Sequence, residues 1–229
     1  MPLHAPFDGP AALAPSGLID QANFGISGVR MMIGIFSPFT IGPVALATGV
    51  TGLLALAFII LFFTVGQPFG TLNDICIGLA AILSGLLAWM VYPQYHAQAP
   101  LNSQVMLILA LAGALVALVG SVLVVFGVTG WFLAGLTMAA GYALIGLWLL
   151  GLSYSALHSH SMSHGLVIFG IVIGILMALG LLAIPGILRG IDAWDTAPWY
   201  INLGQASGLG YLILYPIWCI WLGRIFLLK

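Results

Sequence analysis

The chain has 229 residues, of which 62% are hydrophobic and 4% are charged, and its formal net charge at pH 7 is −1. Soluble domains are about 45–50% apolar and about 25% charged. The few charged residues of this chain cannot cover the surface of a soluble fold, so the composition predicts an integral membrane protein. Because no basic cluster is present, the sequence also excludes a nucleic-acid-binding protein.

The chain begins with a segment rich in Ala, Pro and Gly. Residues 1–26 are expected to form an irregular tail, and residues 27–229 a single transmembrane domain. The start of the chain lacks the basic residues, the compact apolar run and the cleavage site of a signal peptide. Residues 27–42 are apolar but contain Pro38 and precede Pro43, which indicates either an interfacial helix or a kinked, overlong first span.

Six long apolar runs follow, separated by short polar or Gly- and Pro-containing segments. Lipid offers the backbone no hydrogen-bond partner, so these runs are expected to be helices. The predicted fold is therefore an all-α, polytopic membrane bundle of six transmembrane helices. The predicted spans are residues 44–65, 72–92, 104–126, 130–152, 165–185 and 208–227. Pro216 is the only residue expected to interrupt a span deeply, so we do not predict the paired broken helices that transporters use.

The basic residues indicate the orientation of the bundle. With six spans, both termini and the second and fourth connections lie on one side, and three of the four Lys and Arg residues belong to that side. The residues on that side are Arg30, Arg224 and Lys229, together with His4, His96, His158, His160 and His164. Because Lys and Arg are retained in cytoplasmic loops, both termini are predicted to be cytoplasmic, in a multi-pass protein of the inner (plasma) membrane.

The connection between the fourth and fifth spans reads "LHSHSMSH" and contains His158, His160 and His164. If the fifth helix begins at His160, then His160 and His164 share a helix face at a spacing suited to a transition metal. A structural zinc site uses four ligands, however, and no Cys, Asp or Glu lies nearby. A polar turn that caps the two helices is the alternative to a metal site.

Asp74 is the acidic residue nearest the interior of the predicted spans. A carboxylate inside a membrane is costly and indicates an ion or proton path, in which Tyr142, deep in the fourth predicted span, is a second polar step. The alternative is that residues 71–74 start the second helix, so that Asp74 caps it at the positive end of the helix dipole. The sequence leaves both interpretations open.

The longest connection between spans holds both charged and aromatic residues. Such a segment could form an outer lip for a lipid or small ligand, although aromatic residues at a membrane interface give the same composition without a ligand. The candidate lip residues are Arg189, Asp192, Trp194, Asp195 and Trp199.

Glycines recur in the fourth and fifth predicted spans. Small residues allow helices to approach closely in lipid, so these two helices are expected to form a tightly packed pair. The glycine-rich faces of these helices could also contact a second copy of the chain in a homo-oligomer or a partner membrane subunit. The glycines are Gly135, Gly141, Gly146 and Gly151 in the fourth span and Gly165, Gly170, Gly174 and Gly180 in the fifth.

Two stretches carry a family resemblance, "LWLLGLSYSALHSHSMSHGLVIFGIVIGILMALG" and "LYPIWCIWLGRIFLL". They resemble small six-span bacterial membrane proteins classed as a domain of unknown function, in which the last helix ends Pro-x-Trp-x-x-Trp-Leu-Gly-Arg. The matching residues are Trp148, Gly165, Gly170, Gly174, Pro216, Trp218, Trp221, Leu222, Gly223 and Arg224. His164 stands where that family has a Pro-Arg pair. The resemblance implies a six-span fold in a bacterial inner membrane and no particular reaction.

Three functions are compatible with the sequence. The first is a non-catalytic bundle, that is, a packing subunit or regulator surrounded by membrane lipids. The second is a transporter or channel for protons, ions or a small apolar solute. The third is a metal-binding membrane protein that uses the histidine turn. No cofactor is predicted, because the predicted spans contain no histidine for haem and no lysine for retinal. The first function is favoured and no enzymatic activity is expected, because the chain lacks paired carboxylates, a Ser/His/Asp set and any Glu.

Reporter fusions test the predicted orientation. A fusion after Lys229 is expected to report a cytoplasmic location, and a fusion within residues 192–202 the opposite location, because cations favour the cytoplasmic side. Alkaline phosphatase and a fluorescent protein at each site give opposite readouts, which controls for expression. A C-terminus on the far side of the membrane would contradict the prediction.

Overall fold

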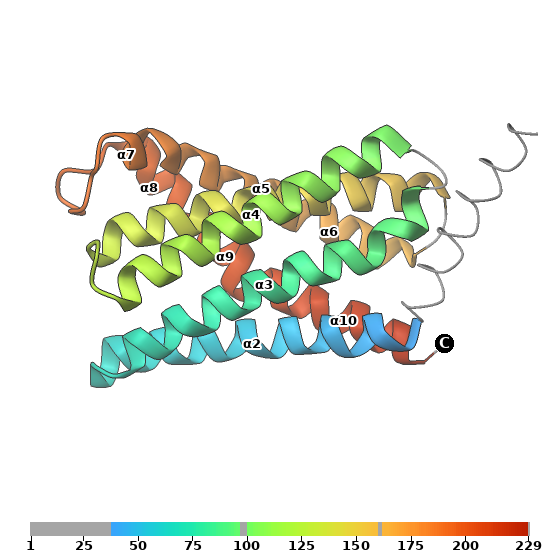
Figure 1. Cartoon of the computed structure of the whole chain (residues 1–229), viewed down its shortest axis with the longest axis horizontal. Coiled ribbons are helices and arrows are strands. Elements are labelled where there is room, and N and C mark those ends of the chain that lie inside the picture. The colour runs from blue at the N-terminus through green and yellow to red at the C-terminus, as the bar shows by residue number, and fades with distance from the viewer. Residues whose placement is uncertain (1–37, 97–99, 160–161, 229) are drawn as a thin grey trace, which may run out of the picture. The chain divides into compact units, whose positions relative to one another are not determined.

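The protein is described from a computed structural model that covers residues 38–96, 100–159 and 162–228. Within these residues the chain is all-α, without strands, and six helical stretches are long and apolar enough to cross a membrane (Figure 1). The predicted six-helix bundle is confirmed, and the protein is a multi-pass membrane protein. The first four spans are α2 (Pro38–Val65), α3 (Phe69–His96), α4 (Pro100–Val125) and α5 (Trp131–Ser159).

The fifth and sixth spans each consist of several consecutive segments. The fifth contains α6 (His164–Ala178), the 3-10 segment η1 (Leu179–Ala183) and α7 (Ile184–Leu188). The sixth contains α8 (Trp199–Gln205), α9 (Ser207–Leu209), the π-helical segment η2 (Gly210–Leu214) and α10 (Tyr215–Leu227).

Both irregular segments, η1 and η2, lie directly before a proline-containing helix start. Pro185 follows η1 and Pro216 follows η2. A proline has no N–H, so the helical bond to the carbonyl four residues earlier is lost. Pro216 lies deep within the sixth span, Trp199–Leu227, as expected, whereas Pro185 lies near the end of the fifth span, His164–Leu188.

Consecutive spans pack side by side from α2 through α3, α4 and α5 to α6. The sixth span divides between the two ends of this series, since α8 packs against η1 whereas α10 packs against α2. It therefore crosses the bundle, as the red segments from α8 through α9 to α10 show in Figure 1. Because η2 contacts both α2 and α6, the break in the sixth span lies in the interior of the bundle.

The two ends of the bundle are named here by their arginines. The α2–α3, α4–α5 and α7–α8 connections lie at the Arg189 end, and the α3–α4 and α5–α6 connections lie at the Arg224 end (Figure 1). The Arg224 end is the one predicted to face the cytoplasm.

Several helix boundaries differ from the prediction. The first span already begins at Pro38, so residues 38–42 belong to it, while residues 1–37, with the predicted tail, lie outside the described residues. The sixth span begins at Trp199 rather than at residue 208, because Pro198, in an extended conformation, is followed directly by helix. The connection between the last two spans is therefore shorter than predicted.

Glycines bring α5 and α6 together, as predicted. A Cβ on Gly146 would lie 3.1 Å from the Gly174 carbonyl oxygen, and one on Gly174 would lie 2.8 Å from the Gly146 carbonyl oxygen. Only some of the predicted glycines lie in the contact between α5 and α6, because the remaining glycines of α5 face other parts of the bundle. Gly170 and Gly180 also face α5, whereas Gly141 and Gly151 lie against α4, Gly165 lies against α10 and Gly135 lies beside open space.

Gly141→Ala is expected to destabilise the bundle by about 1–3 kcal/mol, since overpacking a tight contact carries a cost of that size. The added methyl group would meet the backbone of Ala117 and Gly113 in α4. Gly135→Ala on the same helix is the matched control, because nothing lies within 4 Å of its added Cβ and alanine favours helix over glycine. Thermal unfolding in detergent micelles, followed by circular dichroism, measures the difference. Equal melting temperatures for the two variants would show that the close contact is unimportant.

Candidate functional site

Asp74 lies inside α3 and not at its start. The helix begins at Phe69, and the Leu72 amide already donates to the Pro68 carbonyl at 3.2 Å. The carboxyl group therefore does not serve the free amides of the first turn, and the interpretation of Asp74 as a helix cap is wrong. The residue is only 5% exposed, so its side chain is buried within a span.

The polar contacts of Asp74 are few. Its Oδ1 accepts a hydrogen bond from Asn73 Nδ2 at 3.1 Å, and Ser121 Oγ of α4 donates to its backbone carbonyl at 2.6 Å. Among the described residues, no Lys, Arg or His pairs with the carboxyl group, and the Asn73 Oδ1 is buried without a hydrogen-bond partner. Two adjacent polar side chains are thus incompletely satisfied, which is costly in a low-dielectric interior.

Asp74 and Asn73 line a cavity of about 190 Å³, which we call the Asp74 cavity. It lies toward the Arg189 end, where α3 begins, and its walls come from α2, α3, α5, the sixth span and the loop before α8. Apart from Asp74, Asn73 and Gln205, the lining is apolar or aromatic. The aromatic residues in the lining are Phe63, Trp131, Phe132, Trp194 and Tyr211.

Two tyrosines continue from Asp74 into the bundle. Tyr211 of η2 lies within electrostatic reach of Asp74 and stacks on Tyr142 of α5, with the ring centroids 4.7 Å apart. The Tyr142 hydroxyl donates to the Ile77 carbonyl of α3 at 2.9 Å. The structure therefore brings together the two residues predicted for a proton or ion path, Asp74 and Tyr142, through Tyr211.

Further polar side chains extend this series toward the Arg224 end. Cys219 of α10 lies within electrostatic reach of Tyr142, and the buried Tyr215 has Cys219 and Ser84 as polar neighbours. The Tyr215 hydroxyl has no hydrogen-bond partner in the described part of the chain. We call the series from Asp74 through Tyr211, Tyr142, Cys219 and Tyr215 to Ser84 the polar chain.

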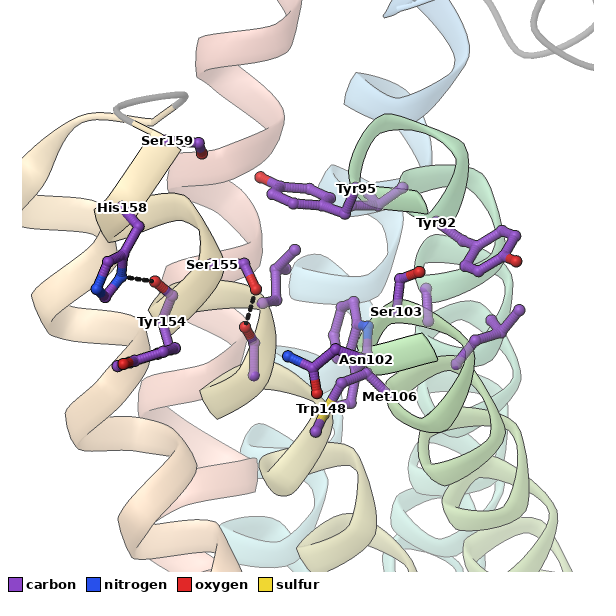
Figure 2. Close-up of a pocket in the computed structure, with 15 residues that line it drawn as sticks. Tyr92, Tyr95, Asn102, Ser103, Met106, Trp148, Tyr154, Ser155, His158 and Ser159 are labelled. Atoms are coloured by element: carbon purple, nitrogen blue, oxygen red, sulfur yellow. Dashed lines mark hydrogen bonds between the residues drawn. The ribbon is translucent and has the colours of Figure 1, made fainter. Parts of the chain in front are cut away.

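A second cavity, of about 360 Å³, lies between α3, α4 and α5 toward the Arg224 end. We call it the Trp148 cavity. Figure 2 shows Tyr92 and Ser103 on its α3 and α4 side and Tyr154 and Ser155 on its α5 side. The described lining contains no Asp, Glu, Lys or Arg, so its polar groups are hydroxyl, amide, imidazole and indole groups.

Glycine contacts explain why the Trp148 cavity lies at this end. Nearer the middle of the bundle, a Cβ on Gly113 of α4 would lie 2.5 Å from the Gly141 carbonyl oxygen of α5, so the two backbones touch. Toward the Arg224 end, the long side chain of Met106 lies over Gly151 instead. The cavity begins where a side chain, and not the backbone, separates the two helices.

The loop after α7 forms part of the wall of the Asp74 cavity. Asp192 accepts hydrogen bonds from the amides of Gly130 at 2.8 Å and Leu133 at 2.9 Å, at the start of α5. Trp194 packs edge-on against Phe132, with ring centroids 5.4 Å apart, and lines the cavity. Asp192 therefore holds in place the loop whose Trp194 lines the cavity.

The other three candidate lip residues lie away from the cavity lining. The Arg189 guanidinium lies 3.5 Å from the Tyr200 hydroxyl, Asp195 is exposed, and Trp199 on α8 is 76% exposed. Only Asp192 and Trp194 of the predicted set are thus positioned to influence the cavity.

The histidine turn differs from the predicted helical arrangement. The helix α6 begins at His164 and not at His160, which lies outside the described residues. His158 belongs to the last turn of α5, where its Nδ1 lies 3.0 Å from the Tyr154 carbonyl oxygen (Figure 2). The described ranges contain no group of three metal-ligating side chains. The metal site over the full turn stays a prediction.

No family model, curated protein or solved structure matches this chain. The two cavities and the polar chain between them are therefore the features from which a function can be inferred.

Asp192→Ala is expected to release the loop from the start of α5, since losing a side-chain acceptor at a helix N-terminus costs about 0.5–2 kcal/mol. Hydrogen–deuterium exchange, measured by mass spectrometry, is expected to become faster in the peptide that covers Gly130 and Leu133. Asp195→Ala is the matched control, because Asp195 is an exposed acid of the same loop. Exchange that stays the same in both variants would contradict this role of Asp192.

Proposed function

We propose that this protein moves protons across the membrane along a path that begins at Asp74. The observation that carries the proposal is a carboxyl group buried inside a span, in the wall of a cavity, without a cation partner among the described residues. Carboxyl groups inside spans are costly and mark proton or ion pathways. A protein that served only as a packing subunit would gain nothing from a carboxyl group that is costly to bury.

The polar chain behind Asp74 supports a path and not an isolated site. Asp74 and Ser84 lie on the same helix, at positions about 15 Å apart along its axis. Ala88, one turn beyond Ser84, lines the Trp148 cavity. The two cavities thus approach the polar chain from opposite ends, and the hydroxyl and thiol groups between them can pass protons together with water.

Ser84, at the far end of the proposed path, donates its hydroxyl proton to the Ala80 carbonyl, and Tyr142 is the control point in the middle of the path. The Tyr142 hydroxyl proton is donated to the Ile77 carbonyl, so this conformation is closed to proton transfer at that step. Opening the path requires the Tyr142 ring to turn away from Ile77, and Tyr211 of η2 stacks directly on it. Short 3-10 and π segments inside helices are frequent at functional hinges, which supports η1 and η2 as the parts that move.

The glycine faces give less support to a packing subunit, the first of the functions considered. Gly146 and Gly174 lie against each other, and Gly141 lies against α4. These glycines are used in contacts within the chain, which leaves them unavailable to a partner. A transporter or channel for protons is therefore the function that the geometry supports best.

The proposed location is the plasma membrane of a bacterium, with the Arg224 end in the cytoplasm. Two arguments support this location: the retention of Lys and Arg on the cytoplasmic side, and the resemblance of the C-terminal third to six-span bacterial proteins. In this orientation the Asp74 cavity faces the outside and the Trp148 cavity faces the cytoplasm.

Proton movement is tested with the purified protein in liposomes that contain a pH-sensitive dye. Under a potassium diffusion potential, wild-type liposomes are expected to acidify faster than empty liposomes. Asp74→Asn keeps the size of the side chain but removes its proton, and it is expected to slow the flux by about tenfold or more. Asp195→Asn is the matched control and is expected to behave like the wild type, since Asp195 lies outside both cavities.

Two results would contradict the proposed function. One is wild-type flux equal to that of empty liposomes, and the other is full flux in Asp74→Asn. Circular dichroism and gel filtration of each variant show whether a loss of flux comes with an intact fold.

A further inference from the structure

The Asp74 cavity lacks the positive charge that its carboxylate requires. In the described part of the chain the Lys and Arg residues are Arg189 and Arg224, and neither lines the cavity; no histidine lines it either. An ionised carboxylate in such surroundings is stabilised only when it is paired. No described side chain therefore supplies this charge, whereas a proton on Asp74 or a cationic ligand would.

Asn73 adds a requirement for hydrogen-bond donors. Its Nδ2 donates to Asp74 Oδ1, and this bond fixes the orientation of the amide, because an ionised carboxylate only accepts. Asn73 Oδ1 is therefore an acceptor, and it is buried without a partner among the described residues. Asn73 itself is 2% exposed and lines the cavity. A ligand with N–H donors would serve both acceptors.

The walls of the cavity suit an organic cation better than a metal ion. The faces of aromatic rings attract organic cations, and aliphatic side chains from α2, α3 and η2 offer a surface to an alkyl body. A hard metal ion takes about six to eight oxygen ligands, whereas the described lining has three side chains with amide or carboxylate oxygens, those of Asn73, Asp74 and Gln205. The aromatic residues concerned are Phe63, Trp131, Phe132, Trp194 and Tyr211.

We propose that the Asp74 cavity binds a small protonated amine with an apolar body, and that its ammonium group and a proton compete for the Asp74 carboxylate. This inference rests on the proposed function, because it names the solute whose movement the proton path would drive. When the ammonium group pairs with Asp74, the proton held by Asp74 leaves, so that one positive charge replaces another.

Competition implies that amine binding weakens as the pH falls. The titratable side chains near Asp74 are Tyr211 on η2 and, stacked on it, Tyr142 on α5, while the described lining from α2 is apolar and α4 adds the Ser121 hydroxyl. None of these groups carries a positive charge when protonated. Protonation of Asp74 itself is therefore what changes the charge of the cavity.

The test is calorimetric titration of the full chain in lipid nanodiscs with cyclohexylammonium, using cyclohexanol as a neutral ligand of similar shape. Wild type is expected to bind the amine about tenfold or more tightly than the alcohol, with an affinity that falls as the pH is lowered. Asp74→Asn is expected to weaken amine binding about thirtyfold, because it removes one partner of a buried charge pair. Asp195→Asn is expected to bind the amine as the wild type does.

Asn73→Leu is a second variant, which removes the acceptor and keeps a similar size. It is expected to weaken binding of the amine about tenfold and to leave binding of the alcohol unchanged. If the wild type binds the amine and the alcohol with equal affinity, that result alone overturns the inference, and no variant is needed. If proton flux depends on Asp74 but the amine does not bind, the amine site is overturned and the proposed function stays in place. If the amine binds but no proton flux is measured, the proposed function is overturned and the amine site is supported.

Discussion

Lipid offers a peptide group no hydrogen-bond partner, and this constraint decides where the bundle can be irregular. Pro185 and Pro216 each remove an amide donor from a span, so the carbonyl groups that they leave must lie within the protein. The bundle meets this requirement by packing η1 against α5 and α8, and η2 between α2 and α6. Tyr211, which belongs to η2, is thereby placed beside Asp74 in the interior.

Backbone contacts at glycines determine the remaining interior space. Where Gly113 meets Gly141 and Gly146 meets Gly174, the helices leave no room for side chains or water between them. Gly135 is the exception on α5, because it lines the Asp74 cavity and has open space beside it. The helix α5 thus packs closely against its neighbours at Gly141 and Gly146, and it borders the Asp74 cavity at Gly135.

The length of the apolar runs was enough to predict six spans, and the scarcity of acids in them was enough to single out Asp74. Its place in α3 could not be decided from the sequence, because residues 71–74 resemble a helix start, whereas helical hydrogen bonding already begins at Pro68. Of the aromatic residues in the wall of the cavity, only Trp194 was singled out from the sequence, as a candidate lip residue. Trp131 and Trp194 come from segments far apart in the chain, and only tertiary packing brings them to the same cavity.

The contact between Asp192 and the start of α5 makes access to the Asp74 cavity sensitive to ionic strength. Asp192 is exposed, and its carboxylate is held by the amides of Gly130 and Leu133 and by the positive end of the α5 dipole. Salt screens such exposed interactions. Because Trp194 follows in the same loop and lines the cavity, one wall of the Asp74 cavity depends on a contact that salt weakens.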